Sequence, residues 1–256
     1  MRMKQAANGP ATNELASRLR IVLVEPNHPG NIGGAARAMK VMGLTRLAMI
    51  RPQRYPDPQA EWRAAGALDV LDGAQLFDSV EEAIADCQLV IGTSTRSRRI
   101  PWPEVDARGA ARRIIDEAPG QQVAILFGRE ASGLTNDELQ RCHVHLLIPA
   151  NPEYPSLNLA MAVQIVCYEL YQYALADSGG ASVTAWDREP ATSAQLESLI
   201  EHWDDVLEEL RYLDPNNPGK VMMRFRRLFT RLELDETEAQ MLRGFLSHVQ
   251  KMRKSQ

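Results

Sequence analysis

Residues 20–43, RIVLVEPNHPGNIGGAARAMKVMG, contain a strand, a glycine-bearing loop and a helix in succession. Arg20–Pro26 is a short run of apolar and β-branched residues, which is typical of a buried strand. Asn31–Met42 has the small and apolar residues of a helix, and Gly43 follows it as a helix-ending glycine. Small residues where a strand leads into a helix let a ligand approach the backbone closely.

Strands and helices continue to alternate as far as residue 176. Strands are predicted over Leu44–Ile50, Leu89–Thr93, Val123–Phe127 and Val144–Pro149, and helices over Ala60–Leu71, Ser79–Cys87, Ala107–Glu117, Thr135–Cys142 and Asn158–Ala176. This order predicts an α/β fold with a mostly parallel sheet that is covered by helices on both faces. Ligands of such folds bind at the carboxyl ends of the strands. Three unusual loops stand there: Asn27–Gly34, Gly128–Leu134 and Ala150–Leu157.

The chain is predicted to divide into four segments. Residues 1–19 are expected to be a flexible tail, residues 20–176 the α/β domain and residues 177–192, rich in Gly, Ser, Ala and Thr, a linker. Residues 193–256 are expected to form a small helical domain with the helices Ser193–Leu213, Lys220–Leu232 and Glu236–Met252. The first helix is acidic and the last two are basic, so a positive surface is compatible with the net charge of −4. Two solvated helix faces would give the same pattern.

The composition predicts a cytoplasmic protein without a membrane span. Cys87, Cys142 and Cys167 are scattered and odd in number, which argues against a disulfide framework. The polar N-terminus lacks the apolar core of a signal peptide. No run of about 18 uncharged apolar residues is present.

Two nucleotide-binding motifs are excluded by their spacing. Gly30, Gly33 and Gly34 do not match G-x-G-x-x-G, and Arg51 stands where a dinucleotide-binding domain needs an acidic residue. The phosphate-binding motif G-x-x-x-x-G-K-[ST] is absent from the sequence, which disfavours an ATPase.

No metal site is expected. Cys142, His143 and His145 lie close together, but no second pair of ligands stands near them in the sequence. They are interpreted as strand-surface residues. The G-x-S-x-G motif of hydrolases is also missing, although a triad of separated residues is not excluded by sequence.

The helix Asn158–Ala176 is apolar nearly all round. Such a helix must be buried on more than one side, either under the sheet or at an interface between subunits. The interface is the favoured interpretation.

Three segments together resemble the SPOUT class of RNA methyltransferases, and closely resemble its TrmJ family. Glu25–Arg37 (EPNHPGNIGGAAR) is similar to the motif N-x-G-x-x-x-R, Phe127–Leu134 (FGREASGL) to FGxE-x-x-GL, and Ile148–Leu159 (IPANPEYPSLNL) to I-P-x…SLN. The resemblance covers about residues 20–175. The basic helix Lys220–Arg231 (KVMMRFRRLFTR) also resembles the C-terminal extension of TrmJ.

The resemblance implies a deep trefoil knot, a homodimer, and S-adenosylmethionine as the methyl donor. It places the donor against Thr93, Ser94, Thr95, Gly128, Ile148, Ser156 and Leu157. The implied activity is 2′-O-methylation of nucleotide 32, a cytidine or uridine, in the anticodon loop of tRNA. The same reaction on rRNA and a non-catalytic RNA-binding protein are the alternatives.

The resemblance also implies the residues that act on the RNA. Arg37 is carried over as the catalytic residue, with Asn31, Glu130 and Asn158 beside it. A guanidinium is hard to deprotonate, so Arg37 is expected to stabilise negative charge on the ribose oxygen rather than to act as a base. Contacts to RNA are expected from Arg129, Arg96, Arg98, Lys220, Arg224 and Arg227.

Overall fold

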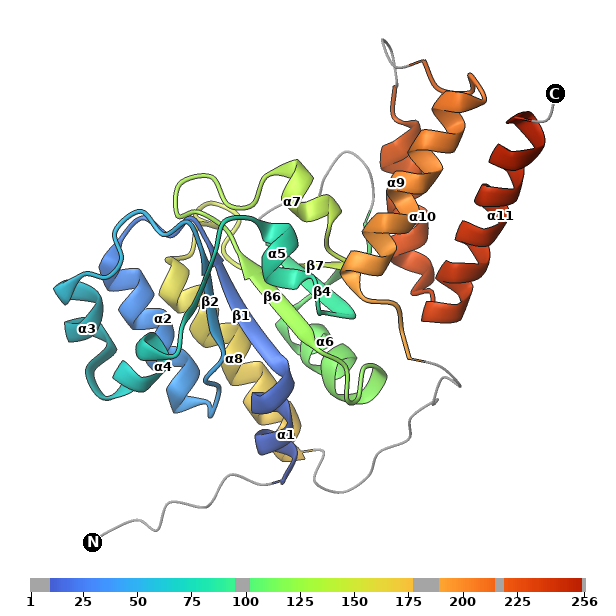
Figure 1. The fold of residues 1–256 in the computed structure, drawn as a ribbon. Helices are drawn as coiled ribbons and strands as arrows, with labels where there is room; N and C mark the ends of the chain where they lie inside the picture. The colour runs from blue at the N-terminus through green and yellow to red at the C-terminus, as the bar shows by residue number, and fades with distance from the viewer. Residues whose placement is uncertain (1–9, 95–101, 177–188, 215–218, 255–256) are drawn as a thin grey trace, which may run out of the picture.

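The computed structural model describes residues 10–94, 102–176, 189–214 and 219–254. Within these residues, one seven-stranded sheet has the order β3-β2-β1-β6-β4-β7-β5, and every pair of neighbouring strands is parallel. Helices cover the sheet, and a group of helices stands beside it (Figure 1). The predicted α/β fold with an added helical domain is therefore confirmed.

The described strands are β1 Leu19–Val24, β2 Leu47–Ile50, β3 Gln75–Phe77, β4 Leu89–Ser94, β5 Glu104–Val105, β6 Val123–Phe127 and β7 Val144–Leu147. The described helices are α1 Pro10–Arg18, α2 Pro29–Val41, α3 Pro58–Ala64, α4 Leu68–Asp72, α5 Val80–Ile84, α6 Ala107–Arg112, α7 Asn136–Gln140, α8 Leu159–Ala176, α9 Ser193–Glu209, α10 Val221–Leu232 and α11 Glu236–Lys254. A 3₁₀ turn, Ala65–Ala67, follows α3, and a π-helical turn, Arg113–Glu117, follows α6.

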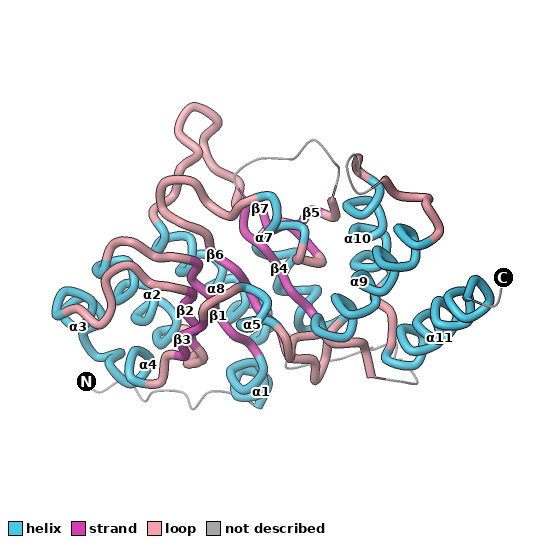
Figure 2. The backbone as a smooth tube through the Cα atoms, turned by 45° about the horizontal axis from the view of Figure 1, so that its top comes forward, coloured by secondary structure: helices cyan, strands magenta, loops and turns pink. Residues whose placement is uncertain are grey.

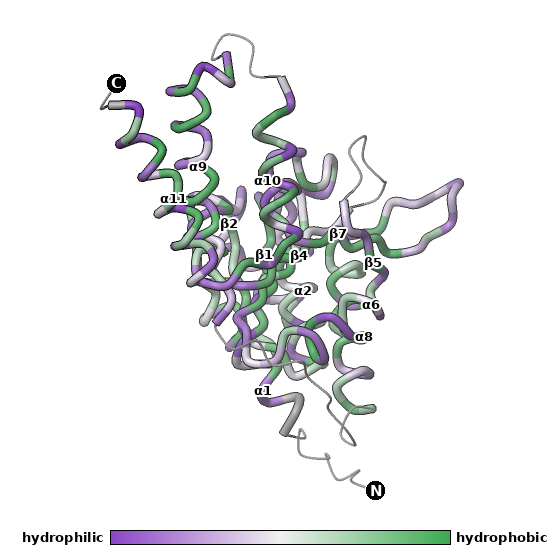
Figure 3. Tube along the Cα trace, turned by 90° about the vertical axis from the view of Figure 1, so that its right-hand side faces the viewer, coloured by the Kyte–Doolittle hydropathy of each residue, from purple (hydrophilic) through white to green (hydrophobic). Residues whose placement is uncertain are grey.

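The two faces of the sheet are covered by different helices. The larger apolar cluster includes side chains from α1, α2, α3, α4, α6 and α8, and the smaller one includes side chains from α5 and α7. The central strands are buried on both faces. Ile21 and Val22 of β1 are consecutive residues that point to opposite faces of the sheet, and both are buried. Hydrophobic residues accordingly colour these strands green in Figure 3.

The register of the parallel strands brings the loops of interest to one edge. Leu23 of β1 is level with Phe127 of β6, and Ser94 of β4 is level with Leu147 of β7. The chain therefore leaves these strands at the same edge of the sheet. The loop from β7 to α8 projects from that edge (Figure 2).

The predicted flexible tail is wrong for its second half. Residues 10–18 form α1, which packs against α8 and contributes the buried Leu15 to the larger cluster. The Arg18 guanidinium donates to the carbonyl oxygens of Ile114 and Ala118 at 3.1 and 2.9 Å. A buried arginine with carbonyl partners is a long-range feature, which the local polarity of the sequence did not indicate.

Three further differences have local causes. The predicted helix Ala60–Leu71 is interrupted at Ala65, whose φ is 50°. Strands β3 and β5 were not predicted, because they are very short and partly exposed. His143 and His145 are buried and not on the strand surface.

The described residues after 188 form three helices around a separate core. Trp203 of α9 stacks on Phe225 of α10 at 5.1 Å between ring centroids. This domain meets the sheet domain where α9 packs on α5 and where the Ser193 amide donates to the Cys87 carbonyl at 2.9 Å. None of the described helices combines the length and the apolar character that crossing a bilayer requires.

Candidate active site

Three hydrogen-bonded side chains join α2, the loop after β6 and the start of α8 at the carboxyl edge of the sheet. Asn31 donates from Nδ2 to Oε1 of Glu130 at 2.9 Å, and Asn158 donates from Nδ2 to Oδ1 of Asn31 at 2.8 Å. The partners are 99 and 127 residues apart in the sequence. The fold thus brings together three of the four predicted catalytic residues.

Glu130 is held in its ionised form by donors on the neighbouring loop. The backbone amides of Asn27 and His28 donate to its carboxylate at 3.0 and 3.1 Å. Burial opposes ionisation, but the hydrogen bonds from Asn31, Asn27 and His28 outweigh it and lower the pKa of Glu130. These two amides were not predicted, since no side-chain pattern signals a backbone donor.

Asn31 is free for this bridge because it does not cap its helix. Helix α2 begins two residues earlier than predicted, at Pro29, a residue suited to the first turn. His28 is the N-cap, and its Nδ1 accepts from the Gly30 amide at 3.1 Å. Asn31 therefore lies within α2, and its side-chain amide bonds to Glu130 at one end and to Asn158 at the other.

Asn158 has two roles. Its Oδ1 accepts from the amides of Ala160 and Met161 at 3.0 and 3.4 Å, so Asn158 caps the start of α8. Its Nδ2 remains available for Asn31. The start of α8 is thereby tied to α2.

A cavity of about 560 Å³ adjoins the hydrogen-bonded chain through Glu130. Its lining residues include Thr93, Ser94, Gly128, Ile148, Ser156 and Leu157. These are six of the seven predicted cofactor-binding residues, and the seventh, Thr95, lies outside the described residues. The size is within the range of small-molecule sites.

Gly128 lets the loop after β6 fold back against itself. A Cβ at this position would overlap the carbonyl carbon of Gly133 and the amide nitrogen of Leu134. The Gly133 amide donates to the Arg129 carbonyl at 2.8 Å, which closes the turn. The wall of the cavity is therefore a compact loop whose shape depends on glycine.

Arg37 stands apart from the Asn31 bridge. It lies six residues later on α2, about 9 Å along the helix axis and about 120° around it. Its side chain is exposed, and no described residue pairs with its guanidinium. One turn earlier, a Cβ at Gly33 would overlap the Ala60 carbonyl oxygen, so α3 packs close to this part of α2.

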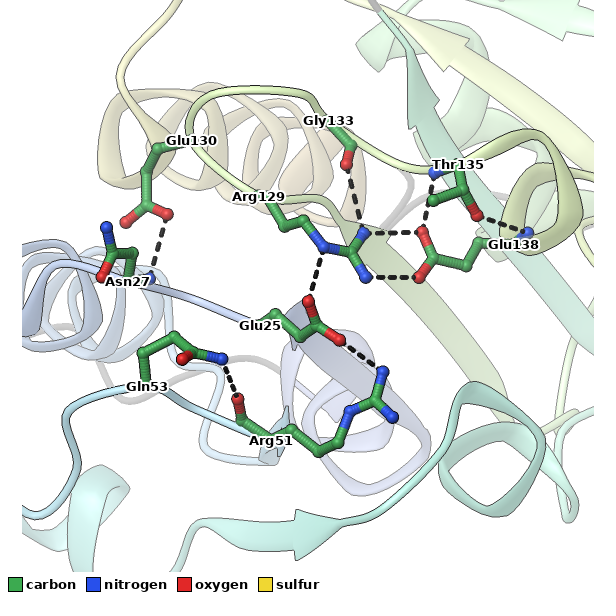
Figure 4. Close-up of polar contacts among 9 residues, drawn as sticks. All are labelled: Glu25, Asn27, Arg51, Gln53, Arg129, Glu130, Gly133, Thr135 and Glu138. Atoms are coloured by element: carbon green, nitrogen blue, oxygen red, sulfur yellow. Dashed lines mark hydrogen bonds and ion pairs between the residues drawn. The ribbon is translucent and has the colours of Figure 1, made fainter.

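Arg129 is held by two carboxylates (Figure 4). Its Nε donates to Glu25 at 2.7 Å, and its two terminal nitrogens donate to Glu138 at 3.0 Å each. Glu138 also accepts from the Thr135 amide at 2.7 Å in the capping box of α7. The predicted contact of Arg129 with RNA phosphates does not fit this arrangement, because all three nitrogens of its guanidinium already donate to carboxylates.

The charges of this cluster reinforce one another. Hydrogen bonds from Arg129 and Arg51 lower the pKa of Glu25, although burial acts against them. Hydrogen bonds to Glu138 and Glu25 raise the pKa of Arg129. Glu25 and Arg129 therefore stay charged, and their hydrogen bonds help to fix the loop that carries Glu130.

The predicted RNA-binding residues of the helical domain differ in their surroundings. Lys220 and Arg224 are exposed on or beside α10, whereas Arg227 is partly buried and has a partner. Arg226, between them, pairs with Glu197 of α9 at 2.6 Å and helps to hold the two helices together. Arg96 and Arg98 lie outside the described residues.

The two histidines near Cys142 have structural partners. His143 accepts at Nδ1 from the Val90 amide at 3.0 Å, and burial lowers its pKa to about 4. His145 stacks on Trp102 with 5.4 Å between ring centroids. No cluster of three or more metal-ligating side chains occurs in the described part of the chain.

Residues 18–168 match the SpoU rRNA Methylase family, and residues 194–256 match the tRNA methyltransferase TrmJ C-terminal domain. A protein of Cronobacter sakazakii called tRNA (cytidine/uridine-2′-O-)-methyltransferase TrmJ is 47% identical, with 93% of this chain and 98% of that protein covered. The tRNA (cytidine/uridine/adenosine-2′-O-)-methyltransferase TrmJ of Pseudomonas aeruginosa is 45% identical, with 93% and 96% covered.

A solved structure, TrmJ from Z. mobilis, shares the fold with a TM-score of 0.78 at 35% identity. It covers 90% of this chain and 98% of its own. Family matches on both domains, similarity along nearly the whole chain and the parallel sheet all agree. The chain therefore belongs to the SpoU methylase family and, within it, to the TrmJ methyltransferases.

Proposed function

We propose that this protein transfers a methyl group from S-adenosylmethionine to the 2′-hydroxyl of nucleotide 32 in the anticodon loop of tRNA, in the cytoplasm. The convergence of Asn31, Glu130 and Asn158 beside the glycine-walled cavity carries the proposal. The match of the helical domain to a tRNA methyltransferase domain supports tRNA over rRNA as the substrate.

The cavity lining fits S-adenosylmethionine. Loop backbone around Gly128 and Leu157 offers amides and carbonyls for an adenine edge, and Ile148 adds apolar surface. The donor supplies a methyl group on a positively charged sulfur, which is already a strong electrophile. The protein must then align a ribose oxygen and stabilise the negative charge that develops there.

The described side chains divide this work. Arg37 carries a positive charge without a carboxylate partner among the described residues, so it can hold the developing oxyanion or an adjoining phosphate. The chain from Glu130 through Asn31 to Asn158 fixes the relative position of the three loops. Lys220 and Arg224, with Arg227, are proposed to contact the tRNA backbone from the helical domain.

We also propose a homodimer that forms along α8. Met161, Tyr168 and Leu175 are exposed and follow one another at intervals of seven residues, so they lie on one face of the helix. The opposite face is buried in the larger apolar cluster. A second copy is the simplest cover for this stripe, and it can bring its own Arg37 to the site. We also propose that the chain forms the trefoil knot that the resemblance implies.

The test is methyl transfer from labelled S-adenosylmethionine to purified tRNA and rRNA. We expect label in tRNA only, and mass spectrometry of the digested tRNA should place it on the ribose of nucleotide 32. Labelling of rRNA alone would refute the proposed substrate. Absence of transfer to either RNA, with binding intact, would indicate a non-catalytic RNA-binding protein.

A further inference from the structure

Residues 51–63, RPQRYPDPQAEWR, border the active site without belonging to any of its motifs. At one end, the backbone amide of Gln53 donates to the Pro26 carbonyl at 3.1 Å, and Arg51 pairs with Glu25. At the other end, the side chain of Arg63 packs next to Gly30. Segment 51–63 therefore runs beside residues 25–30, which hold Glu130 on their other side.

Three side chains of this segment are exposed, which is unusual for the tryptophan. Trp62 is 73% exposed, and the side chains of Arg51 and Arg54 are 57% and 60% exposed. The Arg63 guanidinium lies over the Trp62 ring, 5.1 Å from its centroid. The exposed indole ring, with one guanidinium beside it, is available to a ligand that has a flat aromatic group.

Two of the arginines are held in place while most of their donors remain free. Arg51 contacts one oxygen of Glu25, whose other oxygen is fixed by Arg129 (Figure 4). Arg54 contacts Asp57 at 3.1 Å, and Asp57 is fixed in turn as the N-cap of α3. A guanidinium has five N–H donors, so each arginine can still bind a phosphate.

This combination matches single-stranded RNA. Unpaired bases stack on aromatic rings and on guanidinium planes, and the phosphates between them need cations. We propose that segment 51–63 is a second RNA-binding surface, on which Trp62 stacks a base of the anticodon loop and Arg51, Arg54 and Arg63 bind the adjoining phosphates. The inference rests on the proposed function, which supplies a loop of unpaired nucleotides at this edge of the sheet.

A second copy of the chain fits the surface less well. A symmetric dimer places the same patch of both subunits together, so the three arginines of each copy would meet at one interface with only Asp57 and Glu61 to offset them. The exposed stripe on α8, in contrast, consists of Met161, Tyr168 and Leu175, which are uncharged and can pack against their copies. RNA is therefore the better occupant of segment 51–63.

The stacking part is tested with two substitutions of Trp62 in the full-length protein. The probe is an anticodon stem-loop RNA, and its Kd is measured by fluorescence anisotropy. Trp62→Leu keeps an apolar side chain without a stacking plane, and it should raise the Kd roughly 5- to 150-fold, the range for loss of one base–aromatic stack. Trp62→Phe restores a plane and should recover most of the affinity. Equal affinities of the leucine variant and the wild type would overturn the stacking.

The phosphate part is tested by the salt dependence of the same Kd. Arg51→Ala, Arg54→Ala and Arg63→Ala should each reduce the slope of log K against log salt concentration by about 0.7, the value for one phosphate contact on a single strand. Arg112→Ala is the control, because Arg112 is a similarly exposed arginine that lies on α6. Unchanged slopes in all three variants would refute the phosphate contacts.

Two controls separate this inference from the proposed function. Wild-type protein that binds the stem-loop but does not methylate tRNA would refute the proposed function alone. Active wild type whose Trp62 and arginine variants bind RNA normally would refute only the second surface. Sedimentation of Trp62→Leu should show the same oligomer as the wild type, and dissociation would assign the patch to a subunit interface instead.

Discussion

Replacing Asn31 by aspartate should introduce a pH-dependent instability that alanine at the same position does not. Asn31 donates to the Glu130 carboxylate at 2.9 Å and accepts from Asn158 at 2.8 Å. Aspartate has nearly the same shape and keeps an acceptor for Asn158. It replaces the donor, however, with an oxygen that is negatively charged when ionised, next to another carboxylate.

The magnitudes follow from these contacts. Asn31→Ala removes one hydrogen bond to a charged acceptor, worth about 1.5–3 kcal/mol, and one neutral bond, worth about 0.5–1.5 kcal/mol. The three hydrogen-bonded side chains border solvent, so we expect the lower end of the summed hydrogen-bond energies, about 2 kcal/mol. In Asn31→Asp, two ionised carboxylates at about 4 Å add a repulsion of up to about 4 kcal/mol at an effective dielectric constant of 20.

The sign of the pH dependence follows from proton binding. The repulsion raises the pKa of the carboxylate pair in the folded variant above the unfolded aspartate value of about 3.9. Between these values the folded state binds more protons than the unfolded state, so stability falls as pH rises. The extra penalty of Asn31→Asp is absent below about pH 4 and complete above the raised pKa.

Thermal unfolding of the wild type and both variants between pH 4.5 and 8 is the assay. Asn31→Ala should lower Tm by about 4–8 °C at every pH, since 1 kcal/mol corresponds to about 2–4 °C in a chain of this size. Asn31→Asp should approach the alanine variant at pH 4.5 and fall well below it at pH 8. A difference between the two variants that does not change with pH would refute the placement of Asn31 against Glu130.

Three other substitutions test the cavity, the proposed catalytic role of Arg37 and the proposed dimer. Gly128→Ala should abolish S-adenosylmethionine binding in isothermal titration, because the added Cβ overlaps Gly133 and distorts the loop; binding at wild-type affinity would contradict the loop geometry. Arg37→Ala should bind the donor normally but lose methylation, and mixing it with Gly128→Ala under subunit exchange should restore about one quarter of wild-type activity if Arg37 acts across a symmetric dimer; no recovery would place it in the same subunit. Tyr168→Arg should give monomers in sedimentation analysis, whereas Arg112→Ala should sediment like the wild type.

Local patterns in the sequence were enough to predict five of the seven described strands of the sheet. Val123–Phe127 is the same strand in prediction and structure, and the predicted helix Thr135–Cys142 corresponds to α7, whose start carries the Thr135–Glu138 capping box. Both signals depend on residues next to one another in the chain. The loop motifs also predicted residues that line the cavity. Each motif follows a strand of the parallel sheet, and such strands end at one edge.

Features that depend on distant residues could not be predicted. Arg18 is the last residue of α1, and its guanidinium donates to carbonyls about one hundred residues away, in and just after the turn that follows α6. Arg129 was expected to bind RNA because it is a basic residue in a loop motif. Only the fold shows that Glu25 and Glu138 are positioned to take up its donors. The backbone amides that hold Glu130 carry no side-chain signature at all.

The two arginines of the loop motifs, Arg37 and Arg129, show that the effect of a charge depends on the groups that pair with it. Arg129 lies between two carboxylates, so the pair Arg129–Glu138 adds little net field at the cavity and serves to hold the loop. Arg37 has no carboxylate partner among the described residues, so its full charge is available to an oxyanion. A guanidinium remains protonated during such a reaction, and its effect is therefore electrostatic. It follows that lysine at position 37 should retain part of the rate, whereas lysine at position 129 cannot replace the three directed bonds that arginine makes there.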